Sequence, residues 1–179
     1  QVAEVIVVIN SRGAALYEPI AASILDERLK PAVTGGQSRG VSVGNGLKAA
    51  VGDYVAIHDG ARPLVPLDAL ERVFAQARKS GAAFLALPVT DAVWQVTDGR
   101  ATTALPRDAI WRAQTPQVFE RRAILAAHAA HDGPADDDVA IAVAAGLDVH
   151  PVRGSQLNLT ITLPRAIAPA AQPVGSRSE

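Results

Sequence analysis

The sequence predicts an α/β fold with a mostly parallel sheet, helices on both faces and a protruding β-arm. Two observations lead to this prediction. Short apolar segments alternate with amphipathic ones up to about residue 90, and an alternating hairpin pattern follows them. The 179 residues fit one domain, and 49% apolar with 20% charged residues permit a sizeable core. We expect this domain to cover 1–168 and a disordered tail to cover 169–179.

The first half of the chain has the alternation typical of a parallel sheet. Runs of Val, Ile, Ala and Leu predict strands buried on both faces at 3–9, 54–58 and 82–89. Apolar residues at helical spacing predict helices at 19–29, 41–50 and 68–80. Ligands of such sheets bind beyond the carboxyl ends of the strands, so polar residues at those ends are candidate site residues.

The second half departs from this alternation. Segments 92–97 and 101–105 flank Asp98-Gly99, a strong hairpin signal, and predict a β-arm over about 91–112. Further helices are predicted at 120–131 and 136–145, and strands are predicted at 148–152 and 157–162.

Composition excludes several classes of function. Seventeen basic and eighteen acidic residues give a net charge of −1, so we expect no nucleic-acid partner. The absence of cysteine excludes disulfides and thiolate chemistry. No apolar run reaches the ~18–20 residues of a membrane span, so we expect no membrane partner and a cytoplasmic location. The chain has no methionine and starts almost directly in a strand, from which we expect it to be N-terminally incomplete.

Asp59 and Arg62 directly follow the predicted strand 54–58. A carboxylate there can accept hydrogen bonds from a sugar hydroxyl or hold a metal, and a guanidinium suits phosphate. The equally simple alternative is an Asp–Arg pair that caps a loop.

Gly35, Gly36, Arg39 and Ser42 lie before or at the start of the predicted helix 41–50. Paired glycines permit close backbone approach to a ligand, and a helix N-terminus favours anions. The segment matches neither the P-loop nor the dinucleotide fingerprint, and a simple turn before a helix explains it as well.

Two further clusters carry charge. Arg107, Arg112 and Thr115 could bind a phosphomonoester, or they could be solvated surface residues. The three carboxylates at 136–138 are expected to complement a helix N-terminus rather than to bind a metal. His128 and His131 are expected on an exposed helix face.

Four motifs then occur in an order and spacing that resemble one known family. They read G-G-x-x-R-x-x-S-V-x-x-G-L at 35–47, H-D-G-A-R-P at 58–63, P-V-x-D at 88–91 and R-x-x-x-W-x-x-x-T-P-Q-x-F at 107–119. A weaker fifth match is N-L-x-I-T at 158–162. Together they resemble 2-C-methyl-D-erythritol 4-phosphate cytidylyltransferases, over roughly residues 3–163.

The resemblance implies a Rossmann-like nucleotidyltransferase that acts with Mg²⁺ in the non-mevalonate isoprenoid pathway. CTP and methylerythritol phosphate would give CDP-methylerythritol and pyrophosphate. The nucleotide-binding positions that it implies are Gly36, Arg39, Ser42, Asp59 and Gly60, with Asp59 also at the metal. The substrate-binding positions are Arg62, Asp91, Arg107 and Thr115, and the β-arm implies a homodimer.

The chain also departs from the family pattern. The match begins at the family's second strand, so we expect the glycine-rich loop that grips the triphosphate to be missing. Thr160 occupies the position of a family lysine, and Ala92 occupies that of a threonine, so no catalytic residue is assigned. Two alternatives therefore stand: a catalytically impaired relative that binds nucleotide or dimerises, and a ribitol-phosphate cytidylyltransferase. Whether a cyclase domain follows, as in some family members, is left open.

Overall fold

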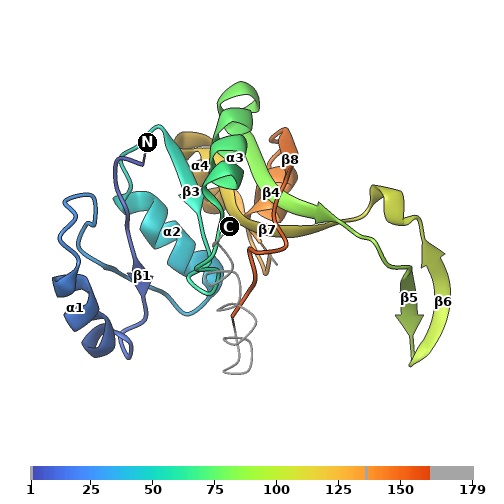
Figure 1. Cartoon of the computed structure of the whole chain (residues 1–179), viewed down its shortest axis with the longest axis horizontal. Helices are drawn as coiled ribbons and strands as arrows, with labels where there is room; N and C mark the ends of the chain where they lie inside the picture. The colour runs from blue at the N-terminus through green and yellow to red at the C-terminus, as the bar shows by residue number, and fades with distance from the viewer. Residues whose placement is uncertain (1, 136, 162–179) are drawn as a thin grey trace, which may run out of the picture. The chain divides into compact units, whose positions relative to one another are not determined.

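The computed structural model describes residues 2–135 and 137–161, which form two compact units (Figure 1). Within the described residues, the first unit comprises 2–57, 118–135 and 137–149, and the second comprises 58–117 and 150–161. The longest strand, β7 (Trp111–Glu120), begins in the second unit and ends in the first. The four-stranded sheet has the order β3-β7-β4-β8, and the predicted α/β class with a mostly parallel sheet is confirmed. The predicted tail at 169–179 lies outside the described residues.

The first unit opens with a parallel strand pair. Strands β1 (Val8–Ile9) and β2 (Val33–Thr34) pair in register, and helix α2 (Arg39–Ala49) packs against both. A side-chain carbon on Gly46 of α2 would lie 2.8 Å from Val8 Cγ2. Glycine inside a helix costs about 1 kcal/mol relative to alanine. Here that cost permits close contact between the helix and β1.

The remaining elements of the first unit supply its buried core. They are β3 (Tyr54–Ile57), α4 (Arg121–Ala130) and α5 (Asp138–Ala144). Helix α4 packs against both α2 and α5. Its core consists of apolar side chains that are at most 4% exposed: Leu47, Val118, Phe119, Ile124, Ala127, Ile141 and Ala142.

The start of the first unit differs from the sequence-based expectation. The strand predicted at 3–9 is reduced to Val8–Ile9 and an isolated bridge, and Val5 is 44% exposed. The helix predicted at 19–29 is α1 (Ala14–Ser23), with Pro19 inside it rather than at its start. Since α1 buries none of its residues, this region lacks the second packing layer that a fully buried strand requires.

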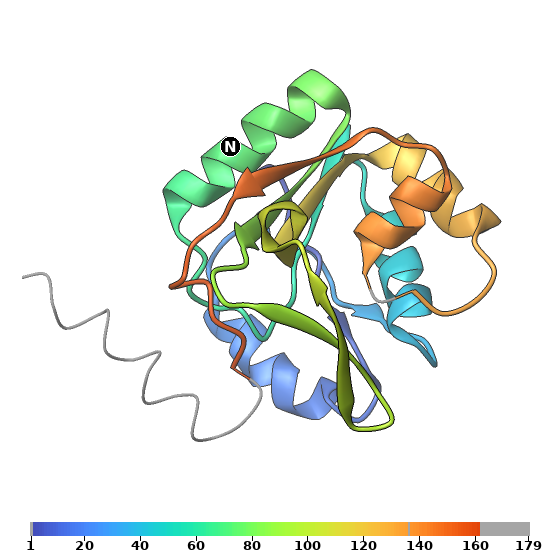
Figure 2. The same ribbon diagram turned by 90° about the vertical axis from the view of Figure 1, so that its right-hand side faces the viewer.

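The second unit is built on a helix and a fully buried strand. Helix α3 (Leu67–Ser80) runs beside β4 (Ala82–Pro88) and β8 (Val149–Arg153), as Figure 2 shows. The predicted helix and the predicted strand at 82–89 are both confirmed. The buried apolar residues of α3 and β4 are Ala69, Val73, Ala77, Ala82, Ala83, Leu85, Ala86 and Leu87. Strand β3, by contrast, is only half-buried, with one residue exposed.

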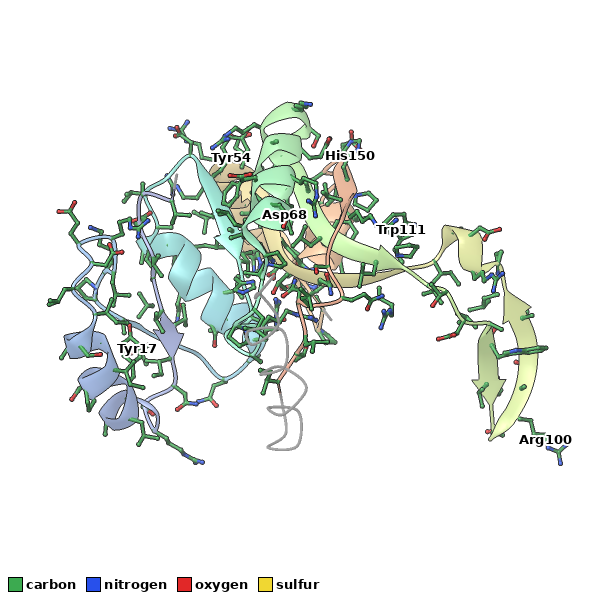
Figure 3. The ribbon with its side chains drawn as sticks, viewed as in Figure 1. Tyr17, Tyr54, Asp68, Arg100, Trp111 and His150 are labelled. Atoms are coloured by element: carbon green, nitrogen blue, oxygen red, sulfur yellow. The ribbon has the colours of Figure 1, made fainter. Side chains whose placement is uncertain are left out.

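A two-stranded arm extends from the second unit. Strands β5 (Val93–Thr97) and β6 (Arg100–Leu105) pair antiparallel, and the 3₁₀ turn η1 (Arg107–Ala109) follows. Asp98 and Gly99 both have positive φ, at 50° and 74°, as the hairpin signal requires. Arg100 lies at the tip of this arm, and Trp111 lies where the chain leaves it (Figure 3).

Two strand assignments fail in the second half. Strand β7 was missed because polar residues and Pro116, which follows a cis peptide bond, interrupt its apolar pattern. The strand predicted at 157–162 is absent from the described residues 157–161. The Asn158 and Leu159 N–H groups donate to nearby carbonyls in local turns, which removes them from any strand ladder. No helix in the described part of the chain is long and apolar enough to cross a membrane.

Candidate functional site

The segment 58–63 forms a closed turn after β3. The Arg62 backbone N–H donates to the Asp59 carbonyl at 2.9 Å, and His58 Nε2 lies 2.9 Å from the Arg62 carbonyl oxygen. Both contacts cross the turn, one through the Arg62 backbone N–H and the other through the Arg62 carbonyl. They limit the directions in which the Asp59 and Arg62 side chains can point.

Thr115 of β7 holds this turn in place. Its hydroxyl accepts a hydrogen bond from the Asp59 backbone N–H at 3.0 Å and lies 3.0 Å from His58 Nδ1. Because a carbonyl oxygen can only accept, Nε2 of His58 donates to the Arg62 carbonyl, and Nδ1 has the Thr115 hydroxyl as its partner. Since Thr115 is only 4% exposed, the structure places it as a buried support of the Asp59 turn.

Asn158 links the same turn to the segment after β8. Its Nδ2 donates to the Thr115 carbonyl at 2.8 Å, and its own carbonyl accepts from Arg62 Nη1 at 2.8 Å. Arg62 Nε also lies 3.5 Å from Asp59 Oδ2. The structure therefore brings together three predicted site residues, Asp59, Arg62 and Thr115, with Asn158, which the sequence indicated only weakly.

A pocket of about 290 Å³ opens beside this cluster. Among the described residues, its lining includes both Arg62 and Arg112 but no carboxylate, so the described charged groups of the lining are all positive. Thr160 also lines the pocket and is exposed. A cavity with this charge favours an anionic ligand.

The predicted site residues of the arm lie elsewhere. Asp91 is exposed at the start of the arm, and Arg107 Nη1 donates to the Thr90 carbonyl at 3.0 Å. Neither residue lines the pocket, so the structure does not bring them together with Arg62. Their contact with a substrate stays a prediction.

The glycine loop predicted to hold nucleotide belongs to the first unit. Ser42 Oγ accepts from the Gly36 backbone N–H at 3.0 Å and donates to the Ser38 carbonyl at 2.9 Å. Ser38 caps α2 by accepting from the Val41 N–H at 3.2 Å, so the helix starts two residues earlier than predicted. Ser42 thus shapes the loop itself, and its contact with nucleotide stays a prediction.

Arg39 has a partner that the sequence did not suggest. Its Nη2 lies 2.7 Å from Oδ2 of Asp138, a fully buried residue, and His128 Nε2 lies 2.9 Å from Asp138 Oδ1. Burial raises the pKa of Asp138. The hydrogen bond from His128 and the ion pair with Arg39 together outweigh burial and hold that pKa below its ordinary value.

One expectation about this region is therefore wrong. His128 does not lie on an exposed face, because its side chain is only 7% exposed against Asp138. The expectation that carboxylates complement a helix N-terminus agrees with the structure for both described residues, because Asp137 and Asp138 lie at the start of α5. Their further contacts differ. Asp137 caps α5 by accepting from the Ala140 N–H, whereas Asp138 is a buried ion-pair partner. Asp136 lies outside the described residues.

Little in the sequence could have revealed these partners. His128 and Asp138 are ten residues apart, on different helices, and Arg39 is 99 residues from Asp138. Among the described residues there is no group of three or more His, Asp or Glu side chains placed to hold a metal.

Comparison with known proteins places this geometry in context. The family model described as IspD, 2-C-methyl-D-erythritol 4-phosphate cytidylyltransferase, matches residues 1–175. A protein of that name from Cereibacter sphaeroides is 48% identical over 141 residues, covering 77% of this chain and 63% of the relative. A bifunctional enzyme IspD/IspF from Dinoroseobacter shibae is 45% identical over 174 residues, covering 96% of this chain and 42% of the relative. The chain thus spans less than two thirds of either relative.

Solved structures agree with the sequence relatives. A 2-C-methyl-D-erythritol 4-phosphate cytidylyltransferase from Thermus thermophilus superposes with a TM-score of 0.81 at 31% identity. The superposition covers 96% of this chain and 82% of the Thermus thermophilus protein. A 4-diphosphocytidyl-2C-methyl-D-erythritol synthase from Anaerococcus prevotii superposes with a TM-score of 0.85 at 27% identity. The match covers 96% of this chain and 78% of that protein.

Proposed function

Because the chain belongs to the 2-C-methyl-D-erythritol 4-phosphate cytidylyltransferase family, we propose that it carries out the cytidylyl transfer of that family. CTP and 2-C-methyl-D-erythritol 4-phosphate would give CDP-methylerythritol and pyrophosphate, in the non-mevalonate route to isoprenoid precursors. The observation that carries the proposal is the convergence of Asp59, Arg62 and Thr115 on one hydrogen-bonded cluster. Two separate motifs of the predicted site supply these residues.

The proposed chemistry depends on position and charge. A phosphate oxygen of methylerythritol phosphate attacks the α-phosphorus of CTP, and pyrophosphate leaves. Such a transfer needs alignment and neutralisation of negative charge rather than a covalent nucleophile. The Arg62 side chain is suited to this role because it is only 16% exposed and is fixed by the Asn158 carbonyl.

Asp59 is the residue that we propose for Mg²⁺. Mg²⁺ in nucleotide enzymes is bound by one or two carboxylates together with substrate phosphates and water. The Asp59 side chain is 38% exposed and stands beside the positive pocket, so a single-carboxylate site fits. The ion would neutralise charge on the triphosphate.

The remaining assignments concern the nucleotide, the partner and the location. Gly36, Arg39, Ser42 and Gly60 are proposed on the nucleotide side. A homodimer through the arm is proposed because apolar side chains there are exposed, including Trp94 at 54%. A cytoplasmic location is proposed for the enzyme.

A pyrophosphate-release assay with CTP, Mg²⁺ and methylerythritol phosphate tests the proposal. Replacing Arg62 by Gln is expected to lower kcat/KM about 10²-fold or more, because one preorganised charged donor is lost. Arg122→Gln, an exposed arginine of α4, is the matched control and should leave the rate unchanged.

The two alternatives predict different results in this assay and in a calorimetric binding experiment. Release of pyrophosphate with ribitol phosphate but not with methylerythritol phosphate would favour the sister activity. Calorimetric binding of CTP and Mg²⁺ without turnover would favour an impaired relative, which the uncharged Thr160 in the pocket supports.

A further inference from the structure

The pocket beside the Asp59 turn contains a cation that the proposed site does not use. Among residues 2–135 and 137–161, no carboxylate pairs with the Arg112 guanidinium. Arg62, the other arginine of the lining, is already held by the Asn158 carbonyl at 2.8 Å and lies 3.5 Å from an Asp59 oxygen. No described carboxylate therefore competes with a ligand for the donors of the Arg112 guanidinium.

A second observation in the same pocket points to a hydroxyl group. Asn158 is fully buried and lines the pocket, and its Nδ2 is used by the Thr115 carbonyl. Its Oδ1 is buried and has no hydrogen-bond donor among the described residues. A buried acceptor without a partner costs about 1–3 kcal/mol, which a hydroxyl from a bound ligand would recover.

We propose that Arg112 binds the phosphate of a phosphorylated polyol in this pocket, with Asn158 Oδ1 accepting a hydrogen bond from a polyol hydroxyl. The two groups differ in what they select. A guanidinium offers forked donors that match phosphate oxygens, whereas a carboxamide oxygen accepts only from a donor. The ligand class is therefore one that has both an anionic and a hydroxyl group. This inference rests on the proposed function, for which it names the substrate-binding residues.

Arg112 is the main candidate for phosphate binding because of the residues that line the pocket around it. The described part of the lining contains neither a lysine nor a carboxylate, and Thr160 contributes no charge. Of the cations that the described residues contribute, removing Arg112 leaves Arg62, whose charge is shared with Asp59. Replacement of Arg112 should therefore weaken mainly the binding of the ligand's phosphate group.

Calorimetry of the full chain with three probes tests both groups. The probes are methylerythritol phosphate, unphosphorylated methylerythritol and methyl phosphate. Arg112→Gln is expected to weaken both phosphate probes about tenfold and to leave unphosphorylated methylerythritol unchanged. Methylerythritol phosphate should bind more tightly than methyl phosphate, because only the former has carbon-borne hydroxyls for Asn158 Oδ1.

The control is Arg122→Gln, which removes an exposed arginine outside the pocket and should change no affinity. Equal effects of the two substitutions, or no binding of either phosphate by the unmodified chain, would overturn the role of Arg112. Equal affinity for methyl phosphate and methylerythritol phosphate would overturn the role of Asn158.

The result of this binding test can be distinguished from the result of the test of the proposed function. If the chain releases no pyrophosphate but Arg112→Gln still weakens phosphate binding, the pocket assignment stands and the reaction fails. If the chain is active and Arg112→Gln keeps the KM for methylerythritol phosphate, the reaction stands and the pocket assignment fails.

Discussion

Replacing Asp138 by Asn removes a buried charge while nearly preserving volume. The carboxylate accepts two hydrogen bonds from basic groups, at 2.7 Å from Arg39 and 2.9 Å from His128. Each bond to a charged group contributes roughly 1.5–3 kcal/mol when shielded. Arg39 is 38% exposed, so its share is discounted to about 0.5 kcal/mol. The carboxamide of the Asp138→Asn variant keeps a neutral hydrogen bond to one of the two partners. The expected loss in the free energy of unfolding is therefore about 2 kcal/mol.

Urea denaturation and thermal unfolding measure this loss. For a chain of this size, about 2 kcal/mol corresponds to a fall in Tm of about 4–8 °C. The matched control is Asp68→Asn, which breaks an exposed pair with Arg72 on α3. This substitution should lower the unfolding midpoint less than Asp138→Asn does. A decrease no larger than that of the control would refute the buried network as a source of stability.

The pH dependence supplies an independent test. In the folded protein the pKa of Asp138 is lowered, so the ionised carboxylate contributes stability above its ordinary value of about 4. That contribution is lost as the pH falls through the lowered pKa. The stability difference between the unmodified chain and Asp138→Asn should therefore be full near neutrality and shrink below about pH 4. A difference that stays constant into acid would show that charge is not its cause.

Two other predictions follow from packing and exposure. Gly46→Ala places a carbon 2.8 Å from Val8 Cγ2 and should destabilise the chain by about 1 kcal/mol, whereas Gly44→Ala meets nothing within 4 Å and should stabilise it by about 0.5–1 kcal/mol. Equal effects in urea denaturation would contradict the close contact. Trp94→Ser on the arm should weaken a dimer in sedimentation experiments, and Leu25→Ser, a fully exposed apolar control, should not. A monomer at every concentration would contradict dimerisation through the arm.

Much of the secondary structure followed from local patterns. Helix α3 was predicted to within one residue because its apolar spacing and Gly81 stop are contained within one segment. The hairpin around Asp98-Gly99 was predicted for the same reason. Helix α1 was misplaced because Pro19 was taken as a helix start, although the structure has it inside the helix.

The candidate site was predicted only in part. Asp59, Arg62 and Thr115 could be identified from motifs, because each motif is a short run of neighbouring residues. That Thr115 supports the Asp59 backbone, 56 residues away, was not visible in those motifs. The role of Asn158 as a link to Arg62 and Thr115 depends on a turn that replaced the predicted strand at 157–162.

The sequence by itself determined the α/β class, the arm and the family, because periodicity, turn chemistry and ordered motifs are properties of the linear chain. The tertiary structure alone decided which charges are paired and which remain available. Arg39, a predicted nucleotide-binding residue, pairs with Asp138, and Arg112, one of several candidate cations, lines a pocket to which the described residues contribute no carboxylate. The physical reason is distance along the chain. The free energy of a charge depends on partners and burial that folding brings from up to 99 residues away.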